Sequence, residues 1–263
     1  MALDLYIDGF AFCTQTPQPQ DFAPWFEARR LRRMEAQSAQ MLFASCQALE
    51  MAGQPVAQEK PFGLSLGIGP GSLQNTCKFM DSILQDGDEL SSPTAFAGSV
   101  HNAAGLTLSL FLNLRGPCLT SGQFNTSFGA ALLTAQSFLY SAMAPYVLVA
   151  VADSVNPVAC ALREKYPQGV AGALSTGYPT HTAAALLISA QKTPHAKAKI
   201  TDFQFLCRQP AYVPCLGEGW APLAAGPAIE LCSLLKQGKN HFEIKDNSLG
   251  VCTVIKGELL NAY

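Results

Sequence analysis

Hydrophobic and polar positions along the chain repeat with different periods, and these periods predict a mixture of strands and helices. Residues 3–12 alternate with a period of two, as an opening strand does. Apolar residues within 29–52 recur at helical spacing and Gly53 follows, which predicts an amphipathic helix closed by a glycine. Residues 146–152 are apolar without alternation, which is typical of a strand that helices cover on both faces. The pattern therefore favours an α/β fold.

The stretch 114–153 predicts a strand, a sharp turn, a buried helix and a second strand. Residues 118–124 mix apolar and small side chains at strand length, after an Arg-Gly-Pro turn. Small and apolar residues dominate 126–143, so we expect a helix that is buried nearly all round. Residues 124–127 then form the elbow between strand and helix. Such elbows expose a side chain beside free backbone N–H groups, so the candidate chemistry lies here.

Composition narrows the class of protein. The 263 residues are 49% hydrophobic, which is ample for a buried core, and could form one large domain or two small ones. A net charge of −2 with 14% charged residues gives no electrostatic footprint for nucleic acid or anionic lipid. No apolar run reaches the roughly 20 residues that cross a bilayer, and no signal-peptide pattern opens the chain. We therefore expect a cytoplasmic protein without a membrane span.

No cofactor or metal ion is expected. The nine cysteines are odd in number, scattered and without a CxxC pair, so neither a disulfide framework nor a zinc site is indicated. Glycines space the predicted strand at 61–69, but no G-x-G-x-x-G opens a helix there and no P-loop lysine follows. Close packing of that strand explains its glycines better than a nucleotide site does.

The elbow segment resembles the nucleophile segment of β-ketoacyl synthases in the thiolase-like superfamily. In that family an Arg-Gly-Pro turn is followed by seven residues, the reactive cysteine and Thr-Ser-Gly. Here Pro117 is followed by seven residues and then by Asn125, so the nucleophile position holds an amide, which cannot form the thioester. Cys118 lies seven residues too early, and a buried strand thiol has a raised pKa. We expect Asn125 to cap a helix that starts at Thr126.

Residues 92–117 resemble the synthase segment that lines the acyl tunnel near the dimer interface. The resemblance implies that residues 118–124 form an interface strand, which pairs antiparallel with the same strand of a partner. For the aromatic residues, plain core packing is the alternative. The candidate tunnel and interface residues are Phe96, Ser99, Val100, Cys118, Thr120, Gln123, Phe124 and Phe128.

The resemblance covers the first part of the chain more completely than the second. We interpret 1–263 as a single β-ketoacyl synthase-like domain, with a recognisable N-terminal thiolase half at 1–190 and a truncated C-terminal half at 191–263. Residues 224–235 resemble the helix that follows the second catalytic histidine of the family, but Trp220 or a neighbour stands in that histidine's place. The implied fold is thiolase-like, layered α/β/α/β/α, with a shortened second half.

The resemblance implies a subunit without catalytic residues. A synthase homologue that lacks the cysteine and both histidines resembles a chain length factor, in the short form found with ketosynthases of aryl polyene and other type II polyketide systems. It would form a heterodimer with an active ketosynthase, shape the acyl tunnel and meet an acyl carrier protein through the complex. Two alternatives stay open: a stand-alone acyl-carrier-protein decarboxylase or acyltransferase that uses Asn125, Gln123 or Ser127, and a purely structural homodimer.

One basic cluster adds a further alternative. Arg29, Arg30, Arg32 and Arg33 crowd the start of the predicted helix at 29–52. A solvated face explains them better than a phosphate-binding patch for an acyl carrier protein does.

Overall fold

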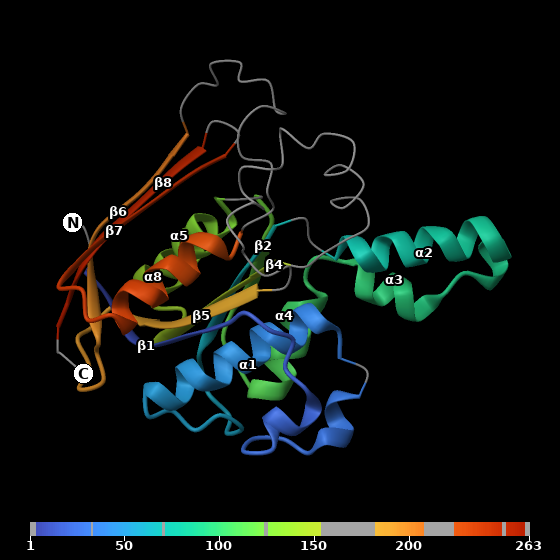
Figure 1. Ribbon diagram of the computed structural model, residues 1–263, viewed down its shortest axis with the longest axis horizontal. Coiled ribbons are helices and arrows are strands. Elements are labelled where there is room, and N and C mark those ends of the chain that lie inside the picture. Colours follow the sequence, from blue (N-terminus) through green and yellow to red (C-terminus); the bar gives the residue numbers. More distant parts are fainter. Residues whose placement is uncertain are drawn as a thin grey trace.

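The computed structural model in Figure 1 describes residues 4–32, 34–69, 72–123, 126–153, 182–207, 224–248 and 251–260. The strands are β1 (Leu5–Cys13), β2 (Gly63–Ile68), β3 (Cys118–Ser121), β4 (Tyr146–Asp153), β5 (Thr182–Ser189), β6 (Ala198–Cys207), β7 (His241–Ser248) and β8 (Val251–Leu259). The helices are α1 (Ala36–Met51), α2 (Leu73–Asp86), α3 (Pro93–Ser99), α4 (Ala103–Leu112), α5 (Ser127–Tyr140) and α8 (Gly226–Lys236). Short 3₁₀ turns are η1 (Pro19–Phe22), η2 (Ala28–Leu31) and η3 (Asp88–Leu90).

The described strands form one mixed eight-stranded sheet in the order β3-β2-β4-β5-β1-β6-β8-β7. Strand β2 pairs in parallel with β3 and with β4, whereas every other neighbouring pair is antiparallel. Strands β3 and β7 are therefore the two edges. Strands β2, β4 and β5 are buried almost throughout, as the unbroken apolar runs predict for strands covered on both faces.

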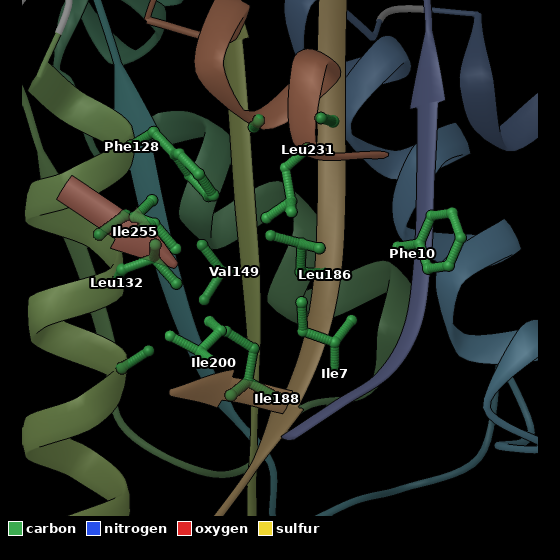
Figure 2. Packing of buried hydrophobic residues seen from close by; sticks show 14 of the residues in the cluster. Ile7, Phe10, Phe128, Leu132, Val149, Leu186, Ile188, Ile200, Leu231 and Ile255 are labelled. Carbon is green, nitrogen blue, oxygen red and sulfur yellow. The ribbon is translucent and has the colours of Figure 1, made fainter. Parts of the chain in front are cut away.

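Helices and strands alternate in layers. Helices α1 and α4 cover one face of the part of the sheet formed by β1 to β5, and α5 and α8 cover the other face (Figure 1). Strands β6, β8 and β7 curl over α5 and α8 as a second β layer. The core cluster in Figure 2 joins these layers, because Phe128 of α5 lies with Val149 of β4 and Ile255 of β8. This mixed α/β arrangement confirms the predicted thiolase-like fold.

The outer face of β6, β7 and β8 carries charge. Glu243 of β7 pairs with Lys245 (3.1 Å) and with Lys256 of β8 (3.5 Å), and the side chains of all three are exposed. Exposed ion pairs of this kind contribute little to stability and mark a solvated surface. No helix among the described residues covers this face.

Two predicted elements are divided in the structure. The predicted helix at 29–52 is a short turn, η2, followed by the separate helix α1, and the Arg30 guanidinium lies over the rings of Phe26 (5.5 Å) and Phe111 (4.9 Å). These contacts join η2 to Phe26 and to Phe111 of α4. Residues 246–255, whose sequence resembles the closing strand of the family, are divided between the two strands of the β7–β8 hairpin, in which Ser248 pairs with Val251.

Helices α2 and α3 project from the layers as a helical arm, residues 72–100, joined by η3 (Figure 1). The rings of Phe79 and Phe96 meet across the arm at 5.2 Å, and Ser72 and Asn75 at its base are its buried residues among those described. Among the described helices, no single one is long and apolar enough to span a membrane. Helices α3 and α4 together reach that length and apolarity, but they are bent by 88°.

Candidate functional site

The elbow between β3 and α5 is fixed by hydrogen bonds on both sides. The Ser127 hydroxyl accepts the N–H of Gln123 (2.8 Å) and donates to the carbonyl oxygen of Ile68 (3.0 Å). The Thr126 hydroxyl donates to the carbonyl oxygen of Gln123 (3.0 Å). At Gly67 of β2, an added Cβ would lie only 2.6 Å from the Ser127 carbonyl oxygen, so a glycine is required there. The segments on either side of residues 124 and 125 are therefore held close to β2.

The predicted nucleophile position, Asn125, and its neighbour Phe124 lie outside the described residues. Helix α5 begins at Ser127, with Thr126 as its N-cap residue. Our expectation that Asn125 caps a helix starting at Thr126 is therefore wrong by one position. The N–H of Thr126 donates to the carbonyl oxygen of Gln123 (3.1 Å).

Cys118 opens the edge strand β3 and is exposed as a residue, so our expectation of a buried cysteine is wrong. Its sulfur nevertheless packs on α4, since an added Cβ at Gly105 would lie 3.1 Å from Sγ. This desolvation raises the pKa of the Cys118 thiol, and a hydrogen bond with Ser109 offsets part of the rise. The thiol therefore stays protonated near neutral pH, which is unsuitable for a nucleophile.

The backbone of β3 presents hydrogen-bonding groups at a free edge. Leu64 of β2 donates its N–H to the carbonyl oxygen of Pro117 (2.8 Å), and Leu64 and Leu66 stand opposite Cys118 and Thr120. In a parallel ladder, alternate residues bond to the same neighbouring strand. The N–H and C=O groups of Cys118 and Thr120 therefore point away from β2, toward the edge that no described strand occupies.

Exposed leucines flank this edge. Leu119 of β3 is 44% exposed, and Leu106 and Leu110 on α4, which packs against β3, are 62% and 67% exposed. Leu133 is also exposed on α5, the other helix that packs against β3. We call the four leucines and the strand β3 the edge surface. Exposed apolar residues around the free edge of a strand are typical of a protein interface.

The remaining candidate residues fall in two other places. Phe96 and Val100 are exposed on the helical arm, where the Ser99 hydroxyl donates to the Phe96 carbonyl oxygen (2.8 Å). Phe128 is fully buried in the core between the sheet layers (Figure 2). The described residues thus place the predicted tunnel and interface residues on the arm, at the edge surface and in the core, and Gln123 is exposed at the elbow. Their tunnel role stays a prediction.

A buried carboxyl group that the sequence interpretation missed lies at the end of β4. The Asp153 carboxylate accepts the backbone N–H groups of Ala224 (3.0 Å) and Ala225 (2.8 Å) at the start of α8. Burial raises its pKa to about 7, the two hydrogen bonds lower it in part, and Asp246 raises it further. The sequence signal for this buried carboxyl group was an Asp at the end of an apolar strand. The positive end of α8 is therefore occupied by a side chain of this chain.

Other candidate chemistry is limited among the described residues. They contain no group of three or more His, Cys, Asp or Glu that could hold a metal ion. His195 lies in the turn after β5 with its ring against Gly53, where an added Cβ would be 2.8 Å from Cε1. Trp220 lies outside the described residues.

Comparison with known proteins gives the family. The model of the β-ketoacyl synthase N-terminal domain matches residues 14–210. The chain belongs to the β-ketoacyl synthase family. No curated protein gives a significant sequence match.

Solved structures of synthases and of their complexes share the fold. The chain is similar to a β-ketoacyl synthase from Burkholderia phymatum STM815, with a TM-score of 0.74, 12% identity, and coverage of 99% of this chain and 100% of the other. It is similar to the ishigamide ketosynthase/chain length factor, with a TM-score of 0.71, 15% identity and coverage of 99% and 100%. It is also similar to the ketosynthase ApeO in complex with its chain length factor ApeC from Xenorhabdus doucetiae, with a TM-score of 0.63, 16% identity and coverage of 98% and 100%. At these identities the likeness concerns the fold alone.

Proposed function

We propose that this chain is a catalytically degenerate β-ketoacyl synthase homologue that acts as the chain length factor of a heterodimeric ketosynthase. Its partner is an active ketosynthase, and the chain shapes the acyl tunnel of that partner. The complex would act in the cytoplasm, in a biosynthetic pathway of fatty acid or polyketide type such as that of aryl polyenes. The observation that carries the proposal is Asn125 at the position where the family places its reactive cysteine. Without a thiolate there, the chain cannot hold the acyl group that condensation requires.

Four of the described cysteines are poor replacement nucleophiles. Burial raises the pKa of Cys13, Cys46, Cys118 and Cys232, the last to about 12. A reactive cysteine needs the opposite, a pKa lowered by a nearby positive charge or helix N-terminus. The thiols of these residues therefore support a role other than covalent catalysis.

The competing enzyme hypothesis has less support at the elbow. Ser127 is fully buried, and its hydroxyl donates to the backbone carbonyl of Ile68 rather than to a base. A serine nucleophile needs a general base that accepts its proton. The Gln123 side chain is exposed on the strand side of the elbow, outside a buried site. A stand-alone decarboxylase or acyltransferase that uses Ser127 or Gln123 would need different hydrogen bonds around these residues.

The two edges of the sheet differ in a way that supports assembly at β3. Strand β7 exposes His241, Glu243 and Lys245, and charged side chains discourage strand pairing. Strand β3 has no charged residue and is flanked by the leucines of the edge surface. We therefore place the ketosynthase at the edge surface, with its equivalent strand antiparallel to β3. An interface of this permanent kind buries roughly 2,000 Å² or more.

The arm supplies the other part of the proposed contact. Phe96 and Val100 are exposed on this chain. A tunnel wall that includes these two residues and Ser99 would therefore face the partner rather than close within the chain. Phe128 would support that wall from the core. An acyl carrier protein reaches the tunnel through the complex. The arginines of η2 are partly engaged within the chain, since Arg29 pairs with Glu27 and Arg30 lies over aromatic rings.

Co-expression tests the proposal. The chain is produced together with a candidate ketosynthase that carries an affinity tag, and the eluate is measured by size-exclusion chromatography with light scattering. A one-to-one complex is expected. The complex is expected to condense acyl and malonyl groups that are carried on carrier protein. The chain alone is expected to give no condensation, and so is a complex in which the reactive cysteine of the ketosynthase is replaced. A homodimer that ignores the ketosynthase would favour the structural alternative, and turnover with the inactive ketosynthase would favour the enzyme alternative.

A further inference from the structure

Exposed apolar side chains are concentrated on the helical arm and on the surface that adjoins it. Among the residues that the structure describes, twelve large hydrophobic residues are exposed, and four of them are the leucines of the edge surface. Five more lie on the arm, and these are Met80, Leu84, Leu90, Phe96 and Val100. Exposed apolar residues that are scattered singly are ordinary, whereas such a concentration marks a contact surface.

Helix α2 has an apolar stripe on a side that does not face α3. Cys77, Met80 and Leu84 follow one another at intervals of three and four residues, so they share one side of the helix. A different side packs on α3, because it carries Phe79, whose ring meets that of Phe96. Met80 is 48% exposed and Leu84 is 78% exposed. The stripe is therefore free to contact another protein.

The edge surface alone is too small for a permanent interface. An interface of standard size involves roughly 20–30 residues on each side, and permanent interfaces are larger. The edge surface consists of the four residues of β3 and of three leucines on α4 and α5. The arm continues this surface, because Val100 comes directly before α4, and Figure 1 shows the arm reaching outward from there. A partner that pairs with β3 therefore needs the arm to complete its contact.

The end of the arm is acidic as well as apolar. We call residues 80–90 the arm tip. Asp81, Asp86 and Glu89 are exposed there beside Leu84 and Leu90, and none of the ion pairs among the described residues includes these three acids. Charges at the rim of a contact surface favour a partner of opposite sign. Two copies of this chain that met tip to tip would bring like charges together. The charge thus favours a different protein with a basic surface.

We propose that the arm tip docks on the ketosynthase subunit, in an apolar groove with a basic rim. This inference rests on the proposed function, and it adds the chemistry of the surface that receives the arm. Pairing at β3 sets the orientation of the two subunits. Met80, Leu84 and Leu90 enter the groove and supply affinity, while the acidic side chains face the basic rim and direct the encounter.

Photo-crosslinking identifies the protein that covers the arm tip. The variant Leu84→p-benzoylphenylalanine is produced together with the candidate ketosynthase, and Lys245→p-benzoylphenylalanine, at the exposed edge strand β7, is the control. A covalent adduct with the ketosynthase is expected from residue 84 and not from residue 245. An adduct of residue 84 with a second copy of this chain, or no adduct at residue 84, would overturn the proposal.

Calorimetric titration with the candidate ketosynthase measures what the apolar side chains contribute. Leu84 and Leu90 are 78% and 74% exposed, so the double variant Leu84→Ser/Leu90→Ser is expected to fold, which circular dichroism checks. Burial of two leucines in a groove is lost, so the dissociation constant should rise about 100-fold. The matched control is Leu206→Ser, which changes an exposed leucine of β6 outside the arm and the edge surface. It is expected to bind as the wild type does.

Association rates at different salt concentrations test the basic rim. The triple variant Asp81→Asn/Asp86→Asn/Glu89→Gln should associate several-fold more slowly than the wild type at low salt, and its rate should depend less on salt. Equal rates with equal salt dependence would overturn the basic rim.

The outcomes separate this inference from the proposed function. If the wild type forms no one-to-one complex with the candidate ketosynthase, the proposed function and this inference both fail. If the complex forms and the Leu84→Ser/Leu90→Ser chain binds within twofold of the wild type, the inference alone fails.

Discussion

Replacing Thr120 by proline tests whether the free edge of β3 is the assembly surface. The register with β2 directs the Thr120 N–H away from β2, so proline removes an outward donor and leaves the bonds between β3 and β2 in place. The loss of one hydrogen bond costs about 1 kcal/mol, and the acceptor left unpaired in the partner costs about 1–3 kcal/mol more. The sum of about 2–4 kcal/mol weakens the heterodimer roughly 30-fold to several hundredfold.

Thr120→Val is the matched control. It keeps the backbone N–H, and the Thr120 hydroxyl makes no hydrogen bond among the described residues, so the valine chain is expected to bind as the wild type does. The dissociation constant with the ketosynthase is measured by isothermal titration calorimetry, and circular dichroism checks that each variant folds. A folded Thr120→Pro chain that binds within twofold of the wild type would refute the placement of the partner at β3.

Three further changes test the elbow and the core. Ser127→Ala removes the hydroxyl that ties β2 to the elbow and should lower the free energy of unfolding by about 1–3 kcal/mol in urea titrations, with activity of the assembled ketosynthase retained. Lys60 is buried and its ammonium donates to backbone carbonyls at the end of α4 and before β2, so Lys60→Met should cost about 2 kcal/mol, whereas exposed Lys192→Met should cost almost nothing. Asn125→Cys, assayed with an inactive ketosynthase, should give no condensation, because the resemblance finds neither catalytic histidine in this chain. Condensation by this variant, or an acyl adduct at Cys118 of the wild type by intact mass, would contradict the scaffold hypothesis.

The fold was largely predictable because the buried strands carry an unambiguous pattern. Residues 146–152 and 183–188 are apolar without interruption, and both lie in central strands. Glycine spacing in β2 was correctly attributed to close packing, since Gly67 faces the Ser127 backbone. The β7–β8 hairpin was missed because both strands and the turn between them share one short stretch of sequence. Length and turn chemistry, rather than hydrophobicity, would have divided it.

The candidate site was less predictable, because side-chain surroundings are set by distant parts of the chain. Cys118 was expected to be buried, yet it opens an edge strand, and only its sulfur is desolvated by α4. The sequence position of Asp153 indicated a strand end but not the α8 N–H groups that it binds, which follow about 70 residues later. Strand order decides both cases, and no local pattern encodes it.

The helical arm has a consequence for how conformational stability is distributed through the chain. The arm is made of two helices and holds few buried residues, whereas β4 and β5 are buried along their whole lengths. Helices of this length are marginal without tertiary packing. Local opening of the arm therefore requires far less free energy than opening of the central strands. A partner that covers Phe96 and Val100 would gain binding free energy from this surface, and the entropic cost of ordering the arm would offset part of that gain. The ease with which the arm opens thus sets an entropic cost on assembly, while the central sheet stays intact throughout.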